Sequence, residues 1–248
     1  MKKQELAKDI LHYTFATQPG RIWATSATVI LNGKKALLID TGYAFQTSLL
    51  LEDLASKHIE VEALIITHFH DDHMEGLKFL PGIPVYGSSR FQDALDKWIP
   101  KENHKYFTPT ILLDAPTTIT FGERTLTLIP APGHSKCGLF VKIDNQFLHL
   151  ADEIMFSAEG KPLLPSIDKG NVKAHLDSLE SLRGYDTFTL LPSHGPVFDG
   201  EKLADEIENR QIYLNALLDS NRLISFEDAT KNCTCMFVHN DWHEDNCK

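Results

Sequence analysis

The sequence predicts an α/β protein in which two β-sheets pack face to face and helices cover their outer sides, giving a four-layer αββα sandwich. Its 248 residues are enough to bury a substantial core. Its content of 42% hydrophobic and 23% charged residues is that of an ordinary globular protein. Each half of the chain carries β-rich runs followed by helical segments, and this order predicts two sheets with outer helices.

The first half of the chain alternates between predicted strands and helices. Residues 21–40 are predicted to form a hairpin because Asn32-Gly33, the strongest short hairpin signal, separates two apolar runs. Residues 45–57 have helical spacing, with leucines gathered on one side. The other elements predicted in this half are strands at 61–67 and 84–88 and a helix at 91–98.

The second half is predicted to continue with strands and to finish with helices. Several short β-rich runs lie between about residues 110 and 150, with turn residues at Gly122 and at Asp144-Asn145. The remaining predicted elements are a helix at 171–183, a strand at 187–191 and a long amphipathic helix at 201–219. We therefore expect one domain over residues 1–225 and a loosely ordered polar segment over residues 226–248.

The composition limits which classes of partner the protein is expected to bind and in which cellular compartment it is expected to occur. The formal net charge of -10 argues against a surface that binds a nucleic-acid duplex, but it does not oppose a small-molecule substrate. No segment approaches the roughly twenty apolar residues that span a bilayer, and no apolar run of a secretory signal follows the first lysines. The four cysteines do not form the framework of a disulfide-rich secreted domain. These features predict a cytoplasmic protein, and they leave its oligomeric state open, with a homodimer as one option.

The segment HFHDDH, residues 68–73, places three histidines and two aspartates in six positions. Alternation along an extended chain directs His68 and His70 to the same side. A following turn would bring Asp72 and His73 towards the same point, and such a group suits Zn²⁺. The alternative is a helix N-terminus capped by Asp71 or Asp72, but capping leaves the three histidines unexplained.

The motif H-x-H-x-D-H directly after an apolar strand resembles the signature of the metallo-β-lactamase-fold hydrolases. The resemblance extends from about residue 20 to residue 200, and further motifs follow in the family's order. They are Asp40 in LLIDTG, His134 in PGHS, Asp152 in HLADE and His194 in LPSHG.

The resemblance implies two mixed β-sheets flanked by helices and a centre of two metal ions, with zinc as the first choice and iron or manganese as alternatives. The first implied metal ion is held by His68, His70 and His134. The second is held by Asp72, His73 and His194, with Asp152 bridging both ions. Asp40 would orient the ligands from outside the centre.

At three positions this sequence differs from particular branches of the family, and these differences narrow the resemblance. His70 stands where the di-iron relatives carry a carboxylate, and Asp152 stands where one class of β-lactamases has cysteine. Phe156 occurs where quorum-signal lactonases carry a tyrosine. The general resemblance is therefore nearest to the glyoxalase II-like thioester hydrolases and the uncharacterised proteins around them.

The implied activity is hydrolysis of an acyl carbonyl, in a thioester, ester or lactone of a small soluble substrate, by a hydroxide held between two metal ions. Asp72 is the expected catalytic residue, which orients the nucleophile and accepts its proton. Two alternatives remain open. One is a phosphodiesterase or ribonuclease of the same fold, and the other is a non-catalytic metal-binding module on the same scaffold.

Irregular loops beside the ligands, residues 98–110 and 153–170, are the expected substrate-binding segments. Their aromatic residues could line an apolar pocket, and their lysines could pair with a substrate carboxylate; ordinary loop packing is the competing interpretation. The candidates are Trp98, Tyr106, Phe107, Phe156, Lys161 and Lys169.

The polar segment 226–248 carries residues that could form a further metal site. Its C-x-C spacing differs from the usual C-x₂₋₄-C pair of a structural zinc site, so flexible chain is the favoured interpretation. The residues concerned are Cys233, Cys235, His239, His243 and Cys247.

Overall fold

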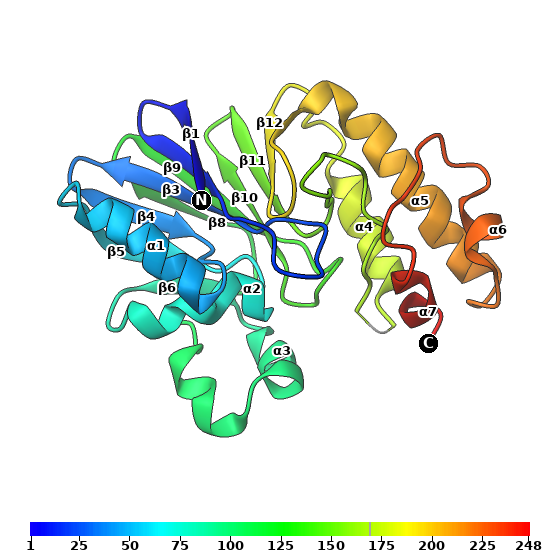
Figure 1. The fold of residues 1–248 in the computed structure, drawn as a ribbon, viewed down its shortest axis with the longest axis horizontal. Helices are drawn as coiled ribbons and strands as arrows, with labels where there is room; N and C mark the ends of the chain where they lie inside the picture. The colour runs from blue at the N-terminus through cyan, green and yellow to red at the C-terminus, as the bar shows by residue number, and fades with distance from the viewer. Residues whose placement is uncertain (169) are drawn as a thin grey trace.

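The computed structural model describes residues 1–168 and 170–248, and two mixed β-sheets form their centre (Figure 1). Among these residues the first sheet has seven strands, in the order β1-β2-β3-β4-β5-β6-β7. Pairing is antiparallel from β1 to β4 and parallel from β4 to β7. The strands are β1 (Lys2–Ala7), β2 (Ile10–Thr14), β3 (Ser26–Asn32), β4 (Lys35–Ile39), β5 (Glu60–Ile65), β6 (Val85–Ser88) and β7 (Ile111–Leu113).

The second sheet has six strands in the described chain, in the order β13-β12-β11-β10-β9-β8. All of its pairs are antiparallel except the pair of β11 with β12. The strands are β8 (Thr117–Phe121), β9 (Arg124–Pro130), β10 (Leu139–Ile143), β11 (Phe147–Ala151), β12 (Thr189–Pro192) and β13 (Phe198–Asp199).

Helices lie on the outer sides of the two sheets (Figure 1). α1 (Ala44–Ala55) covers the first sheet, whereas α4 (Val172–Ser181) and α5 (Leu203–Asp219) lie beside the second. No helix in the described residues has the length and apolar composition needed to cross a bilayer. The shorter helices are α2 (Asp71–Met74), α3 (Phe91–Trp98), α6 (Phe226–Thr230) and α7 (Trp242–Asn246), with 3₁₀ turns η1 (Glu75–Phe79), η2 (Lys101–Tyr106) and η3 (Gly200–Lys202).

Three buried apolar clusters fill the spaces between the four layers. Ile30 and Ile39 of the first sheet meet Leu128 and Val141 of the second in the central cluster. A second cluster lies under α1, and a third joins the second sheet to α4 and α5. Burial of these side chains from water supplies the main favourable term for stacking the layers. The predicted αββα sandwich is confirmed.

Most predicted elements occur within a few residues of their expected positions, including the hairpin β3–β4 and the helices α1, α3, α4 and α5. The strands β1 and β2 were not predicted. β1 has the polar sequence KKQELA and is largely exposed at the edge of the sheet. Its apolar alternation is therefore too weak to mark a strand, and pairing with β2 supplies its order.

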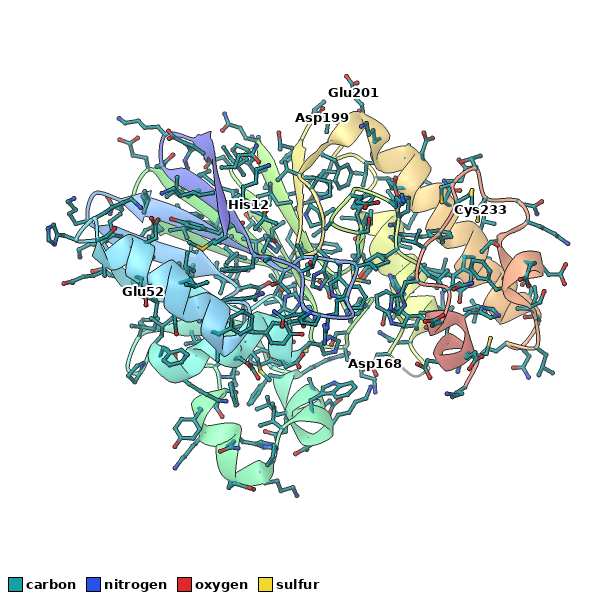
Figure 2. All side chains as sticks on the ribbon, viewed as in Figure 1. His12, Glu52, Asp168, Asp199, Glu201 and Cys233 are labelled. Atoms are coloured by element: carbon teal, nitrogen blue, oxygen red, sulfur yellow. The ribbon has the colours of Figure 1, made fainter. Side chains whose placement is uncertain are left out.

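The segment 226–248, expected to be loosely ordered, instead packs against the second half of the fold. Cys233 lies beside α5 (Figure 2). Asn209 of α5 accepts the backbone N–H of Thr234 at 2.7 Å, and Tyr213 of the same helix lies 3.0 Å from Nδ1 of His243. These polar contacts and separate apolar residues such as Ala229 and Phe237, which join the cluster beside α5, hold this segment. The apolar residues do not form a regular stripe, so hydrophobic periodicity does not predict the packing.

Candidate metal centre

The candidate ligands lie where strands of both sheets end and their following loops meet. His68 and His70 follow β5, and α2 begins at Asp71 with His70 as its N-cap residue. This one-turn helix returns Asp72 and His73 to the same point. The predicted change from extended chain to a turn is therefore present in HFHDDH.

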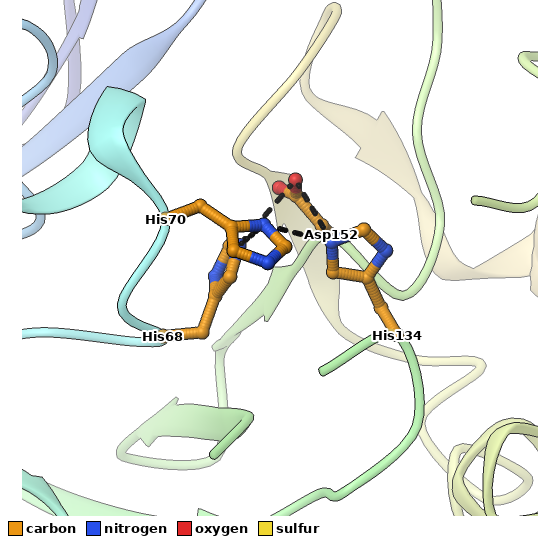
Figure 3. Close-up of side chains that lie close together, drawn as sticks. All are labelled: His68, His70, His134 and Asp152. Atoms are coloured by element: carbon orange, nitrogen blue, oxygen red, sulfur yellow. Dashed lines mark hydrogen bonds and ion pairs between the residues drawn. The ribbon is translucent and has the colours of Figure 1, made fainter. Parts of the chain in front are cut away.

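The first ligand group gathers His68, His70, His134 and Asp152 from three separate segments (Figure 3). Their donor atoms all lie within 4.8 Å of one another. Nε2 of His68 is 3.0 Å from Nδ1 of His70, and Nε2 of His134 is 3.3 Å from the same nitrogen. Three imidazole nitrogens therefore face one small volume.

The second group consists of Asp72, His73 and His194, all buried, with donor atoms again within 4.8 Å of one another. Nε2 of His73 lies 3.6 Å from Oδ1 of Asp72, and Nε2 of His194 lies 3.6 Å from Oδ2 of that carboxylate. Each residue thus presents one donor atom to a common point.

Asp152 lies between the two groups. Its Oδ2 is 3.6 Å from Nε2 of His68 in the first group and 3.1 Å from Nε2 of His194 in the second. Its Oδ1 is 3.4 Å from Nε2 of His73. This is the position that a carboxylate shared by two metal ions would need.

The opposite nitrogens of the histidine rings are held by the fold. Nδ1 of His134 donates to the carbonyl of Ser166 at 2.8 Å, and Nδ1 of His194 donates to the carbonyl of Ala24 at 3.0 Å. A proton fixed on Nδ1 leaves the lone pair on Nε2, the atom that faces the centre. Histidines of metal sites are usually oriented in this way.

Asp40 orients His73 from outside the two groups. Its Oδ2 lies 2.9 Å from Nδ1 of His73 and accepts the hydroxyl of Thr67 at 2.7 Å, while its Oδ1 accepts the Thr67 N–H at 2.8 Å. Asp40 has a φ of 59° and Ala151, next to Asp152, has a φ of 50°. Residues other than glycine adopt this left-handed region at a cost, and here it occurs at two strand ends beside the centre.

Burial and charge divide the histidines into two kinds. Burial lowers the pKa of His68 and His134, and it lowers the pKa of His70 to about 3. Burial also opposes a charge on His73, but the carboxylates of Asp152, Asp40 and Asp72 outweigh it and raise the pKa of His73. Neutral imidazoles are thus favoured in the first group, whereas carboxylates in and around the second group favour positive charge there and also raise the pKa of His194.

The residues present fit a metal centre. Nε2 of His73 and Oδ1 of Asp152 are buried without a hydrogen-bond partner in the described structure, and both point at the space between the groups. Buried polar atoms without a partner are costly. Divalent cations would satisfy these atoms and offset the clustered carboxylates, and a set of imidazole nitrogens and carboxylate oxygens suits zinc, iron or manganese.

A cavity of about 320 Å³ opens onto the centre. Of the residues predicted to bind substrate, Trp98 lines it. Phe107 and Phe156 instead pack in the buried clusters on the two sides of the molecule. Tyr106 is exposed and lies outside the cavity lining, and Lys161 pairs with Glu159 at 3.0 Å away from it. Lys169 lies outside the described residues.

Several residues of the cavity were missed by sequence reasoning. Arg21, Trp23 and Trp242 line it. Arg21 and Trp23 precede the first site motif, and Trp242 lies in the segment considered for a separate metal site rather than for substrate. The chain contains three tryptophans, and this rarity is the sequence feature that could have indicated Trp23 and Trp242 as cavity residues. Asp71 also borders the cavity, and its Oδ1 accepts the N–H of Asp72 at 2.9 Å. It is the first residue of α2, whose N-cap is His70, so it does not cap this helix.

The suggested further metal site at residues 233–247 is not assembled. His243 uses Nδ1 towards the hydroxyl of Tyr213 and Nε2 towards the carbonyl of Ile224. Within residues 1–168 and 170–248, the groups that could hold a metal ion are the two already described.

Comparison with known proteins agrees with this geometry. Residues 20–194, well over half of the chain, match the family model of the metallo-beta-lactamase superfamily. The chain belongs to that superfamily. A solved structure, a metallo-beta-lactamase from Pontibacter korlensis, superposes with a TM-score of 0.68 at 20% identity, covering 84% of this chain and 99% of that one. At this identity the match bears on the fold alone.

The alignments with two curated relatives cover a smaller share of those proteins. A beta-lactamase-like protein 2 homolog of Caenorhabditis elegans is 28% identical over 210 residues, which are 77% of this chain and 63% of that protein. A hydroxyacylglutathione hydrolase of Pectobacterium carotovorum is 29% identical over 150 residues, which are 59% of this chain and 51% of that protein. The match thus spans between half and two thirds of the length of these relatives.

Proposed function

We propose that this chain is a hydrolase that uses two metal ions, with zinc as the first choice, to cleave an acyl ester, thioester or lactone of a small molecule. The observation that carries the proposal is the placement of Asp152 between two groups of buried donor atoms that open onto one cavity. The relatives named as hydroxyacylglutathione hydrolases support acyl chemistry.

In this proposal His68, His70 and His134 hold one ion, Asp72, His73 and His194 hold the other, and Asp152 is shared. When bound, the two ions supply Lewis acidity that polarises a carbonyl and acidifies water. The fold contributes fixed ligand orientations through Ser166, Ala24 and Asp40, so little reorganisation accompanies the reaction.

Asp72 is the residue proposed to move the proton. Its carboxylate lines the cavity while its backbone is fixed in α2, so a water held at the centre lies within its reach. As a ligand and proton acceptor it would orient the attacking lone pair towards the substrate carbonyl. The largely apolar walls of the cavity would shield part of the bound acyl group from bulk water.

Metal content and a substrate panel test the proposal together. Elemental analysis of the purified protein should give about two metal equivalents per chain, and His68→Ala and His194→Ala should each lose close to one. Thioesters, esters and lactones should be hydrolysed, with loss of activity on chelation and recovery with zinc. The same assays on His58→Asn, a change at an exposed histidine before the start of β5, at the opposite end of that strand from His68, provide the control.

Three outcomes would contradict this function. Turnover of phosphodiesters without acyl turnover would favour the phosphodiesterase alternative, and bound metal without any turnover would favour a binding module. A protein that takes up no zinc, iron or manganese would remove the metal centre itself. A cytoplasmic location remains a separate prediction, tested by cell fractionation. The oligomeric state, for which a homodimer is one option, is tested by mass in solution.

A further inference from the structure

All three tryptophans of the sequence line the cavity over the candidate centre. Trp23 lies in the loop between β2 and β3, Trp98 ends α3, and Trp242 begins α7. Segments far apart in the chain therefore contribute their indole rings to one site. No tryptophan belongs to the fully buried core of the described residues: Trp98 is 54% exposed, and Trp242 only borders the cluster beside α5. All three indole rings therefore keep a surface that faces the cavity.

The indole rings extend from the mouth of the cavity to the candidate ligands. The rings of Trp23 and Trp242 lie 5.3 Å apart between centroids. Trp23 meets His194 edge-on at 6.2 Å, and Trp98 meets His70 edge-on at 6.0 Å. One ligand from each group thus contacts an indole, so a molecule whose carbonyl sits at the centre must place its neighbouring atoms against these rings.

The wall beyond the ligands is largely apolar. Met155 joins the three indoles in lining it, and the polar groups there are few: Arg21, Asp71 and Ser166 besides the ligands themselves. Flat aromatic walls favour an aromatic ring, which can stack or meet them edge-on. A sugar or a polar peptide would leave its hydrogen-bonding groups facing carbon.

Arg21 gives the cavity a fixed positive charge. Its guanidinium carbon lies 5.2 Å from the Trp23 ring and 5.4 Å from the Tyr43 ring, and Nη1 lies 3.6 Å from Oδ2 of Asp72. The cation therefore already occupies the aromatic faces that would otherwise attract a ligand cation. Its other donor groups suit a carboxylate.

The volume of the cavity limits the size of the ligand. A cavity of about 150 Å³ is enough to hold benzene, and the volume here is about 320 Å³. The space therefore fits one aromatic ring with a short chain that reaches the centre. It is too small to enclose a polymer.

We propose that this site binds aryl-acyl substrates that carry an anionic group, with the ring among Trp23, Trp98 and Trp242 and the anion at Arg21. This assignment rests on the proposed hydrolase function for the reaction, but binding can be measured without turnover. Because every tryptophan lies at the cavity, the intrinsic fluorescence of the protein reports directly on its occupation.

The test titrates the full-length protein, as purified, with 3-phenylpropionate, acetate, phenethyl alcohol and benzyltrimethylammonium, following tryptophan emission and confirming each Kd by calorimetry. We expect 3-phenylpropionate to bind most tightly and acetate to leave the emission unchanged at the same concentrations. Trp98→Ala and Trp242→Ala should each raise its Kd about fivefold, the value of a lost aromatic contact. Arg21→Met should raise it about tenfold without weakening phenethyl alcohol.

Tyr106→Ala is the matched control, because Tyr106 is an exposed aromatic residue just beyond α3 that does not line the cavity. Its Kd values should equal those of the unchanged protein. Equal binding of acetate and 3-phenylpropionate, or tighter binding of benzyltrimethylammonium, would overturn the assignment. If the protein hydrolyses thioesters and holds two metal equivalents but does not bind aryl carboxylates, this inference alone is refuted. Aryl binding in a protein without metal or turnover would refute the proposed function alone.

Discussion

Asn246, in helix α7, holds the peptide segment that orients the candidate ligand His134. Its Nδ2 donates to the carbonyl of Pro165 at 2.7 Å, and its Oδ1 accepts the N–H of Ile167 at 3.2 Å. Between these residues, the carbonyl of Ser166 accepts the hydrogen bond from Nδ1 of His134 at 2.8 Å. The segment beyond residue 225 is therefore linked to the metal centre through hydrogen bonds.

Replacing Asn246 by Ala should loosen this link. The carbonyl of Pro165 and the N–H of Ile167 would lose their partner, at a cost of about 1–3 kcal/mol in the free energy of unfolding. Metal affinity should fall about tenfold, the lower end of the range for residues that orient ligands. Thermal denaturation and a chelator competition would measure the two effects. Glu244→Gln, an exposed change in the same helix, should alter neither; unchanged metal affinity in Asn246→Ala would refute the link.

Glu153 supports His134 from the other side. Its Oε2 accepts the backbone N–H of His134 at 3.1 Å, and its Oε1 lies 3.3 Å from Nε2 of the buried His175. Gly133 allows this approach, because a Cβ at that position would overlap the carboxyl group. Burial raises the pKa of Glu153 and lowers that of His175 to about 3. A neutral pair is thus favoured beneath the ligand loop.

Glu153→Ala should therefore leave the N–H of His134 buried without an acceptor and destabilise the fold by about 1–3 kcal/mol. Glu153→Gln keeps a carbonyl oxygen that can accept this bond and should recover most of the stability and metal content. Denaturant unfolding and elemental analysis distinguish the variants. If Gln behaves like Ala, the hydrogen bond to His134 is not what Glu153 contributes.

The grouping of the candidate ligands His68, His70, Asp72 and His73 could be predicted from sequence because their positions follow local rules. His68 and His70 alternate along extended chain, and a single turn of helix returns Asp72 and His73, so the pattern is contained in six residues. His134 and His194 lie in short glycine-containing motifs and were found through the order of those motifs. Local pattern was sufficient for residues 68–73, whereas His134 and His194 were placed through the resemblance to the family.

The walls of the cavity could not be predicted in the same way. An aromatic residue in a loop looks the same in sequence whether it enters the core or a pocket: Phe107 is buried under the first sheet, whereas Trp98 lines the cavity. Trp23 and Trp242 are in contact although more than two hundred residues separate them in the sequence. No periodic pattern predicts that contact. The two rings meet where α7, which is held to α5 by Tyr213, lies against the loop between β2 and β3.

Asp72 and Asp71 provide a direct test of the ligand assignment. Asp72 is buried between His73 and His194, whereas Asp71 is exposed at the cavity edge and accepts the N–H of Asp72. Asp72→Ala should remove about one metal equivalent and lower kcat/KM on the order of a hundredfold or more. Asp71→Ala removes one hydrogen bond to the first turn of α2, should cost about 1 kcal/mol of stability, and should retain both equivalents. Equal losses of metal in the two variants would refute the assignment, and full activity in Asp72→Ala would refute the proposed mechanism.

His12 makes the stability of the fold depend on pH independently of the metal centre. It lies on β2 within the first sheet (Figure 2), 2% exposed, with Nδ1 3.1 Å from the hydroxyl of Thr28. Burial, with a contribution from His149, lowers the pKa of His12 to about 3. The folded protein therefore keeps His12 neutral, while the unfolded chain binds a proton near pH 6.5. The stability that depends on neutral His12 is complete above pH 6.5 and is lost as the pH falls towards 3.

Between pH 7 and pH 5, the difference in proton binding between the folded and unfolded states lowers the free energy of unfolding by about 2 kcal/mol for one histidine. His12→Gln cannot titrate but keeps a side chain that can bond Thr28. The variant should be less stable than the unchanged protein at pH 7, and its deficit should shrink by about 2 kcal/mol at pH 5. Urea unfolding at the two pH values measures this, and comparison at each pH cancels the titration of the metal ligands, which both proteins share. A deficit that stays constant between pH 7 and pH 5 would mean that His12 accepts a proton inside the folded sheet.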